Sequence, residues 1–282
     1  MKIGLALFIG GGRGAYQIGV MKAAKTFGLD QKIDVYSGTS VGGLNAALFA
    51  QVDFDLAEEV WNKISNDLIL MKKCKETTTK SGFYLRSNEG LENLIKEYIN
   101  FNTIHDNKKN CYLTCSEYFG KHPSYKSGGI QMINGITAQL NHEGVVYYNL
   151  AAKWSNMMQT KIMLASAAIP FVFPKEQIGN HFYSDGCMTD NLPTCPLYMH
   201  EKCDVIIAVH LKRWPYRKRN VNITGTKIID VYPSKSLGGI LGTLDFSSSN
   251  VKKRIALGYE DAMKALCPVM ECIGENEGII IS

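Results

Sequence analysis

The sequence has no apolar run long enough to cross a bilayer as a helix. Its longest apolar stretch, residues 162–174, spans too few residues and is interrupted by proline. No small-residue cleavage site follows the apolar residues 3–9, so we expect a first strand there and no signal peptide. These two absences favour a cytoplasmic protein, and any contact with membranes would be peripheral and transient.

Common signatures of metal, cofactor and nucleic-acid chemistry are also missing. Of the eight cysteines, only Cys111 and Cys115 stand four apart, and no second Cys or His pair follows at zinc-ligand spacing. The P-loop sequence Gly-Lys-Ser/Thr does not occur, and no nucleic-acid-binding module is recognisable. We therefore expect reduced thiols, no metal, no cofactor and no nucleic-acid partner. The formal net charge of +5 permits contact with an anionic membrane surface or with nucleic acid and requires neither.

The apolar patterns that are present alternate between strand and helix. Residues 2–10 and 32–38 predict buried strands, and residues 15–28 and 41–50 predict the helices that follow them. Such a strand-helix-strand-helix order predicts a parallel sheet covered by helices. Further strands are expected at 110–119, 144–150, 203–211 and 225–233, and further helices at 54–69, 88–101, 151–168 and 247–266. No linker is evident, so the sequence predicts one α/β domain over residues 1–282.

A glycine-rich segment, FIGGGRGAYQIGV at residues 8–20, lies between the first strand and the first helix. Gly10, Gly12 and Ala15 match the spacing of the dinucleotide-binding fingerprint in the right strand-to-helix context. Such a site also needs an acidic residue at the end of the second strand, and that strand ends in Ser37-Gly38. From these residues alone, a tight turn, a nucleotide site and a different close approach of backbone all remain open.

A second motif, Gly38-Thr39-Ser40-Val41-Gly42, has the G-x-S-x-G spacing of a nucleophile elbow. The pattern alone arises by chance in roughly one chain of this length in ten. Its context between an apolar strand and an apolar helix favours the elbow over a serine that merely caps the helix. The motif comes after only the second strand, which is earlier than in the usual α/β-hydrolase arrangement.

Three motifs together resemble the patatin-like phospholipase family: Gly10-Gly11-Gly12-Arg13-Gly14, the elbow around Ser40, and Asp185-Gly186. Residues 165–174 also look like the family's segment ahead of its Asp-Gly motif. The resemblance runs from residue 3 to about residue 265. One departure is Ile9, which stands where the family often has a further glycine, and Gly12 occupies the variable position of the family's loop.

The resemblance implies a three-layer α/β/α fold with a mostly parallel central sheet, and a serine lipid acyl hydrolase of the phospholipase A or lysophospholipase type. Ser40 would be the nucleophile and Asp185 the base, acting on a phospholipid or another lipid ester through an acyl-enzyme. The implied oxyanion hole consists of Gly10, Gly11, Gly12, Arg13, Gly14 and Val41, and the implied elbow and motif glycines are Gly38, Gly42 and Gly186. Neither metal nor cofactor is implied.

Several alternatives stay open at this stage. Asp-Gly is also a strong hairpin-turn signal, and Asp190 is a second carboxylate close to Asp185. His210, at the end of an apolar strand, could complete a Ser-Asp-His triad acting on soluble esters. A nucleotide-binding module that uses the glycine loop, with Ser40 as a helix cap, is a further alternative.

Two segments could serve a lipid enzyme without being catalytic. Residues 212–219 are basic with interleaved aromatic residues, which fits either a solvated loop or an interfacial patch. Residues 72–90 are polar and fit a flexible loop or a lid. Arg13 fits either a surface charge on the first helical turn or a group that holds the glycine loop and a lipid phosphate, and the surface charge is the expectation.

Overall fold

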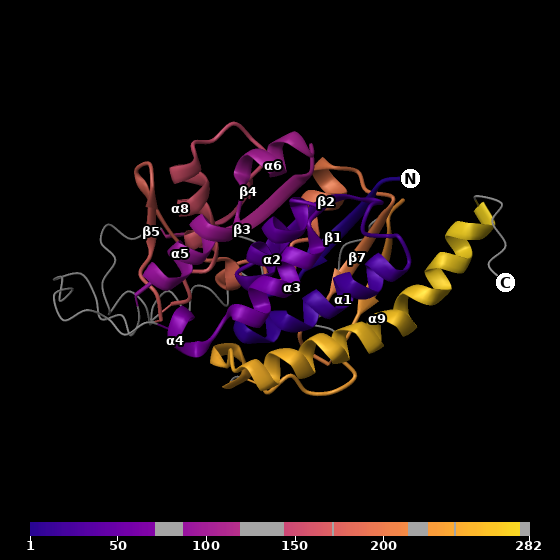
Figure 1. Cartoon of the computed structure of the whole chain (residues 1–282). Coiled ribbons are helices and arrows are strands. Elements are labelled where there is room, and N and C mark those ends of the chain that lie inside the picture. The colour runs from indigo at the N-terminus through magenta and orange to yellow at the C-terminus, as the bar shows by residue number, and fades with distance from the viewer. Residues whose placement is uncertain (71–86, 119–143, 171, 214–224, 240, 277–282) are drawn as a thin grey trace.

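The computed structural model describes residues 1–70, 87–118, 144–170, 172–213, 225–239 and 241–276. In this part of the chain a central sheet of eight strands carries packed helices (Figure 1). The strands follow one another across the sheet in the order β5-β6-β3-β2-β1-β7-β8, and β4 pairs with β3. The strand bounds are β1 Ile3–Leu7, β2 Ile33–Thr39, β3 Asn110–Tyr118, β4 Val145–Asn149, β5 Glu176–Ile178, β6 His181–Asp185, β7 Val205–Val209 and β8 Lys227–Val231.

The middle of the sheet is parallel and one side is antiparallel. Strands β3, β2, β1, β7 and β8 pair in parallel. Strands β4 and β6 both run antiparallel to β3, and β5 is antiparallel to β6. The predicted mostly parallel central sheet is therefore confirmed, and the antiparallel part matters for the site described below.

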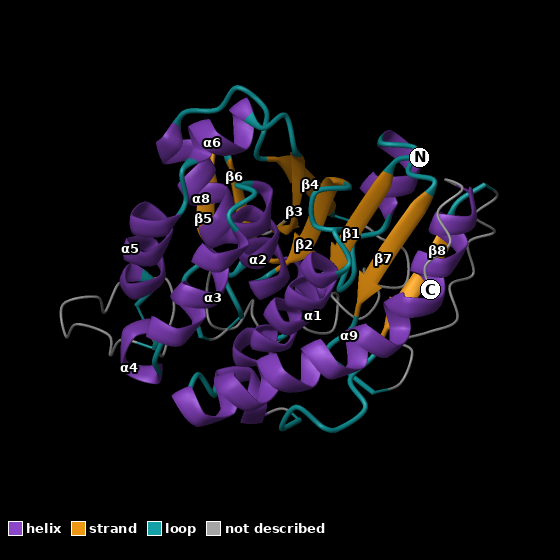
Figure 2. Cartoon of the chain, turned by 45° about the vertical axis from the view of Figure 1, so that its right-hand side comes forward, coloured by secondary structure: helices purple, strands orange, loops and turns teal. Residues whose placement is uncertain are grey.

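Helices cover one face of the sheet in a thick layer, with α1, α2, α3 and α9 in front of the strands (Figure 2). The longest of them, α9, packs along α1, where Gly19 and Gly258 allow the backbones to touch because a Cβ on either would collide with a carbonyl oxygen of the other helix. The helix bounds are α1 Ala15–Thr26, α2 Val41–Ala50, α3 Phe54–Lys63, α4 Asn66–Ile69, α5 Glu89–Tyr98, α6 Phe101–Asp106, α8 Asn156–Ser166 and α9 Ser248–Asn276, with short turns η1 Gly11–Gly14, η2 Gly186–Met188, η3 Pro196–His200 and η4 Leu241–Leu244.

The central strands β1 and β7 bury both faces, as parallel strands between two layers do. In β1, Ile3, Leu5 and Leu7 join the large core under the helices, whereas Ala6 joins a smaller cluster on the opposite face. That smaller cluster includes Leu197 of η3. The three-layer arrangement is thus present, with a thinner second layer in the described residues.

Two expected helices are each divided by a capping residue. The helix expected over 54–69 becomes α3 and α4, because Ile64 is extended and the side chain of Ser65 accepts a hydrogen bond from the Leu68 amide. The helix expected over 88–101 ends at Tyr98, and Asn100 caps the unexpected α6. Short polar side chains compete in this way for the backbone of a continuing helix.

Other expectations differ in extent or cannot be compared. Helix α9 is longer than expected, and α8 is shorter because Ser155 caps it. Most of the segment 72–90 and most of 212–219 lie outside the described residues. No helix in the described part of the chain has both the length and the apolar character needed to span a bilayer.

Candidate active site

The ends of two strands meet on one edge of β3. Strand β4 occupies the other edge of β3, so β2 and β6 share this one: Thr39 of β2 pairs with Thr114, and Asp185 of β6 pairs with the next residue, Cys115. Ser40 follows Thr39 directly. Because β6 is antiparallel to β3, its C-terminal end meets the C-terminal end of β2. Asp185 therefore lies next to the serine that follows β2, although the two residues are far apart in sequence.

Ser40 has the strained backbone of a nucleophile elbow. Its φ is 59° and its ψ is −126°, in a region that L-residues rarely occupy. The side chain makes no capping hydrogen bond to α2, which argues against a simple N-cap role. Its amide donates instead to the hydroxyl of Ser166 at 3.2 Å, and that hydroxyl donates to the Thr114 carbonyl at 2.8 Å. The serine backbone is thus held by α8 and β3, and its hydroxyl is not used to cap α2.

The two elbow glycines are required by close backbone approach. A Cβ on Gly38 would collide with the carbonyl oxygen of Gly42, and a Cβ on Gly42 would collide with the carbonyl oxygen of Leu7. Gly186, after Asp185, is similarly crowded, with Thr114 O 2.6 Å from the position of a Cβ. These contacts explain why small residues flank both Ser40 and Asp185.

Asp185 is almost fully buried and carries an unusual carboxyl group. Burial raises its pKa to about 6, while interactions with the Ser40 side chain and with Cys187 act in the opposite direction. Oδ1 accepts a hydrogen bond from the Cys187 amide at 2.8 Å. The buried Oδ2 forms no well-formed hydrogen bond with the described residues, Ser40 included. Contacts between catalytic groups are often this loose before substrate binds.

The glycine loop is folded back on itself by Arg13. Both the amide and the Nε of Arg13 donate to the Gly10 carbonyl at 3.2 Å. The expectation of a surface charge at Arg13 is wrong, because the side chain is buried and its Nε is used to hold the loop. The Arg13 amide makes the first hydrogen bond of η1. The amides of Gly11 and Gly12 come before it in the chain, so η1 itself does not use them.

A second arginine, Arg254 of α9, supports the loop from behind. Its Nη1 donates to the Gly12 carbonyl at 3.0 Å and to the Asp245 carbonyl at 2.6 Å. Its Nη2 donates to the Leu237 carbonyl at 3.1 Å and approaches the Asp245 carboxylate at 3.2 Å. The segment 241–246 also touches the loop directly, because a Cβ on Gly11 would collide with the Thr243 carbonyl.

A buried polar network ties the loop to the elbow helix. Asn45 of α2 donates to the Gly14 carbonyl at 3.1 Å and to Gln17 at 2.8 Å, and it accepts from Trp61 of α3 at 2.8 Å. Gln17 in turn donates to the Phe8 carbonyl at 2.7 Å. The glycine loop, α1, α2 and α3 are therefore fixed relative to Ser40.

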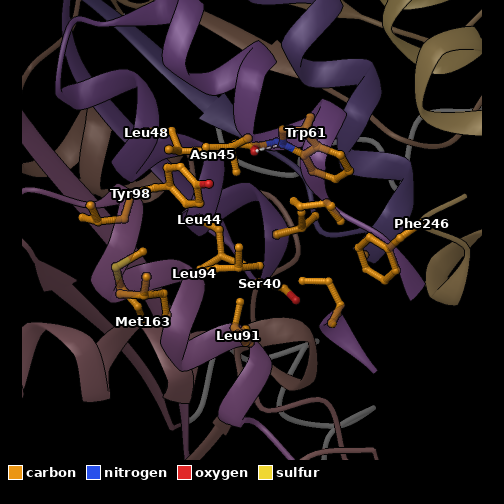
Figure 3. A pocket seen from close by; sticks show the side chains of 18 of the residues that line it. Ser40, Leu44, Asn45, Leu48, Trp61, Leu91, Leu94, Tyr98, Met163 and Phe246 are labelled. Atoms are coloured by element: carbon orange, nitrogen blue, oxygen red, sulfur yellow. Dashed lines mark hydrogen bonds between the residues drawn. The ribbon is translucent and has the colours of Figure 1, made fainter. Parts of the chain in front are cut away.

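An apolar cavity of about 80 Å³ opens beside Ser40 (Figure 3). Gly11, Ser40 and Val41 form its polar end, and Asn45 and Tyr98 also border it. The rest of its wall is apolar and comes mainly from α2, α3, α5 and α8. It includes Leu44, Leu48, Trp61, Leu91, Leu94, Met163 and Phe246.

Two other sequence candidates lie elsewhere or are engaged. His210 bonds Asp230 of β8 at 2.7 Å and stacks on Tyr232 at 4.1 Å between ring centroids, and it does not border the cavity beside Ser40. The carboxylate of Asp190 accepts from Tyr147 at 2.7 Å and from the Leu192 amide at 3.1 Å. Asp185-Gly186 forms the end of β6 and the start of η2 rather than a hairpin turn.

Sequence reasoning missed Ser166, Asn45 and Arg254. Arg254 had a readable signal, since it falls on the apolar face of α9 between Val251 and Ile255. Ser166 and Asn45 carried none, because their partners are set by the tertiary structure. Among the described residues, no group of three or more His, Cys, Asp or Glu side chains could hold a metal ion.

Comparison with known proteins shows the family of this chain. The model of the patatin-like phospholipase family matches residues 10–198, which include the glycine loop, Ser40 and Asp185. A search of the curated proteins found no match. The solved structure of VipD from Legionella pneumophila is similar with a TM-score of 0.44 and 10% identity, over 94% of this chain and 66% of that one. Because the family model covers more than half of its length, the chain belongs to the patatin-like phospholipase family.

Proposed function

We propose that the protein hydrolyses fatty-acyl esters of phospholipids or lysophospholipids through a Ser40-Asp185 dyad. The Ser40 hydroxyl attacks the ester carbonyl carbon, and its proton passes to the Asp185 carboxylate. The tetrahedral intermediate collapses with loss of the lysolipid or alcohol, which takes the proton from Asp185. Water activated by the same carboxylate then attacks the acyl-enzyme and releases the fatty acid.

The oxyanion of this reaction would be held by backbone amides. Those of Gly11 and Gly12 precede the first hydrogen bond of η1, and that of Val41 precedes the first hydrogen bond of α2, which Leu44 makes to Ser40. Gly11, Ser40 and Val41 border one cavity, so the donors at Gly11 and Val41 lie near the nucleophile. The α2 N-terminus adds a favourable dipole for negative charge.

The observation that carries the proposal is the serine with a buried carboxylate beside it at the polar end of an apolar cavity. A carboxylate with an ordinary pKa would be a weak base for a hydroxyl, and burial of Asp185 raises its pKa to about 6. An apolar cavity suits an acyl chain and would disfavour a nucleotide phosphate. The His210-Asp230 pair likewise favours a dyad over a triad.

The remaining parts of the proposal concern the whole chain. A single domain over residues 1–282 is supported by one large core, which joins Leu266 of α9 to Leu5 of β1. We place the protein in the cytoplasm, with transient contact at membrane surfaces where its substrates lie.

A fluorophosphonate probe tests the proposal most directly. The probe should label wild-type protein at a single serine, and peptide mass spectrometry should locate the label on Ser40. Fatty acid should be released in parallel from phosphatidylcholine or lysophosphatidylcholine vesicles. Absence of labelling together with absence of release would contradict the proposal, as would a label on another serine.

Arg254 should act as a positioning residue for the glycine loop. Losing one oxyanion donor typically costs about 3 kcal/mol of transition-state stabilisation. We therefore expect Arg254→Met to lower kcat on a small soluble ester by about 10- to 100-fold with little change in KM. Arg254→Lys, which can reach one carbonyl, should recover part of kcat.

Thermal unfolding of both Arg254 variants provides the control. A merely structural role would lower the melting temperature and the active fraction while leaving kcat per labelled Ser40 unchanged. That outcome would remove the loop-positioning role.

A further inference from the structure

Two leucines of η4 are exposed in a way that folding does not explain. Leu241 is 86% exposed and Leu244 is 42% exposed, whereas Leu237, just before them, is buried. Single exposed leucines are common on protein surfaces. Two on the same turn form an exposed apolar patch, and covering that patch would remove apolar surface from water.

The same segment leads from this surface into the active site. Phe246, two residues after Leu244, borders the cavity and stacks with Trp61 at 6.3 Å between ring centroids. Figure 3 shows Phe246 on the opposite side of Ser40 from Met163. The carbonyl of Thr243 touches Gly11. The segment 241–246 thus connects the exposed apolar patch, the cavity wall and the glycine loop.

Positive charge accompanies the leucines. Lys235 and Lys253 are exposed and border, together with Leu241, a hollow between η4 and α9. Lys252 is exposed next to Lys253. Glu260 and Asp245 also border the hollow, and Asp245 is bound by Arg254. Exposed leucines beside lysines suit an interface of apolar tails and anionic headgroups.

We propose that η4 is the lipid-docking element of this protein, and that it places Leu241 and Leu244 in the leaflet of an anionic phospholipid membrane that faces the protein. This proposal rests on the proposed function. The leucines would enter the acyl region while Lys235 and Lys253 lie at the headgroups. Because Phe246 and the glycine loop are joined to η4, docking there would bring the cavity to the membrane.

Binding should be measured in the Ser40→Ala background, so that hydrolysis does not alter the vesicles. Flotation with vesicles of phosphatidylcholine and phosphatidylglycerol should show at least tenfold weaker binding for Leu241→Ser/Leu244→Ser, roughly as expected for losing two partly inserted leucines. The matched control, Met157→Ser/Met199→Ser, removes two other exposed apolar side chains, 70% and 53% exposed on α8 and η3. The control should bind like the parent protein.

The charge should be tested separately from the leucines. Lys235→Gln/Lys253→Gln should weaken binding to the anionic vesicles and should matter little with pure phosphatidylcholine. Added salt should reduce the binding of the parent protein to the anionic vesicles. Equal binding of the lysine variant and the parent to anionic vesicles would remove the electrostatic half of the proposal.

Hydrolysis by proteins that retain Ser40 separates this inference from the proposed function. For Leu241→Ser/Leu244→Ser, the ratio of activity on vesicles to activity on a monomeric short-chain ester should fall at least tenfold. An unchanged ratio with unchanged vesicle binding would overturn docking at η4 while leaving the enzyme proposal intact. Wild-type protein that neither hydrolyses any ester nor reacts with fluorophosphonate would instead overturn the proposed function.

Discussion

Replacing Ser40 with alanine should lower the rate of fatty-acid release by about 10⁴- to 10⁶-fold, the size seen when a serine nucleophile is removed. The fold should survive, because the Ser40 side chain makes no capping hydrogen bond and its amide can still donate to Ser166. The measurement is hydrolysis of phospholipid vesicles and of a soluble ester, together with the melting temperature.

Matched variants make the Ser40 result specific. Ser37→Ala removes a buried hydroxyl within β2, one that donates to the Pro193 carbonyl at 2.6 Å, and should cost stability without comparable loss of activity. His210→Ala should also keep activity, whereas a Ser-Asp-His triad requires its loss. Hydrolysis by Ser40→Ala above about one per cent of wild type would place the nucleophile elsewhere.

Asp185→Asn should lower kcat/KM by about 10²- to 10⁴-fold, the usual contribution of a general base. The base works only when ionised, so wild-type kcat/KM should decline about tenfold per pH unit below a pKa of about 6. The matched control is Asp190→Asn, which alters a neighbouring carboxylate that binds Tyr147 and the Leu192 amide. Equal loss of activity in both variants would contradict the assignment of the base.

The same substitution should make the protein more stable at neutral and higher pH. The pKa of the Asp185 carboxyl is raised in the native state from 3.8 to about 6, so the native protein holds this proton more tightly than the unfolded chain does. Stability from this group is therefore full below about pH 4 and is lost as the pH rises through about 6. Asp185→Asn avoids that loss.

The expected gain at pH 8 is up to about 3 kcal/mol in the free energy of unfolding, and it should vanish toward pH 4. Denaturant titration of wild type and Asp185→Asn at both pH values measures it. A variant less stable than wild type at pH 8 would show that burial of the charged Asp185 carboxylate does not destabilise the native protein. A gain in stability with a loss of activity is the trade expected at a catalytic group.

Much of the fold could be read from local sequence. Helix α2 has the expected bounds, Val41–Ala50, because an apolar strand, a glycine-flanked serine and an apolar helix follow one another without a break. The strand before it, the glycine loop and α1 are likewise predicted by patterns among neighbouring residues. Boundaries failed where one capping side chain outweighed periodicity, as at Ser65 and Asn100.

The site itself was only half contained in these local patterns. The sequence alone determined an elbow at Ser40 and a loop that needs glycine, since backbone crowding is a property of a few neighbouring residues. The tertiary structure decided that Asp185 meets Ser40, because β6 pairs with β3 at the position where β2 ends. It likewise bound His210 to Asp230 and brought Arg254 to Gly12. Periodicity records which side of an element is buried, whereas the partner that buries it depends on strand register and helix packing across the whole chain.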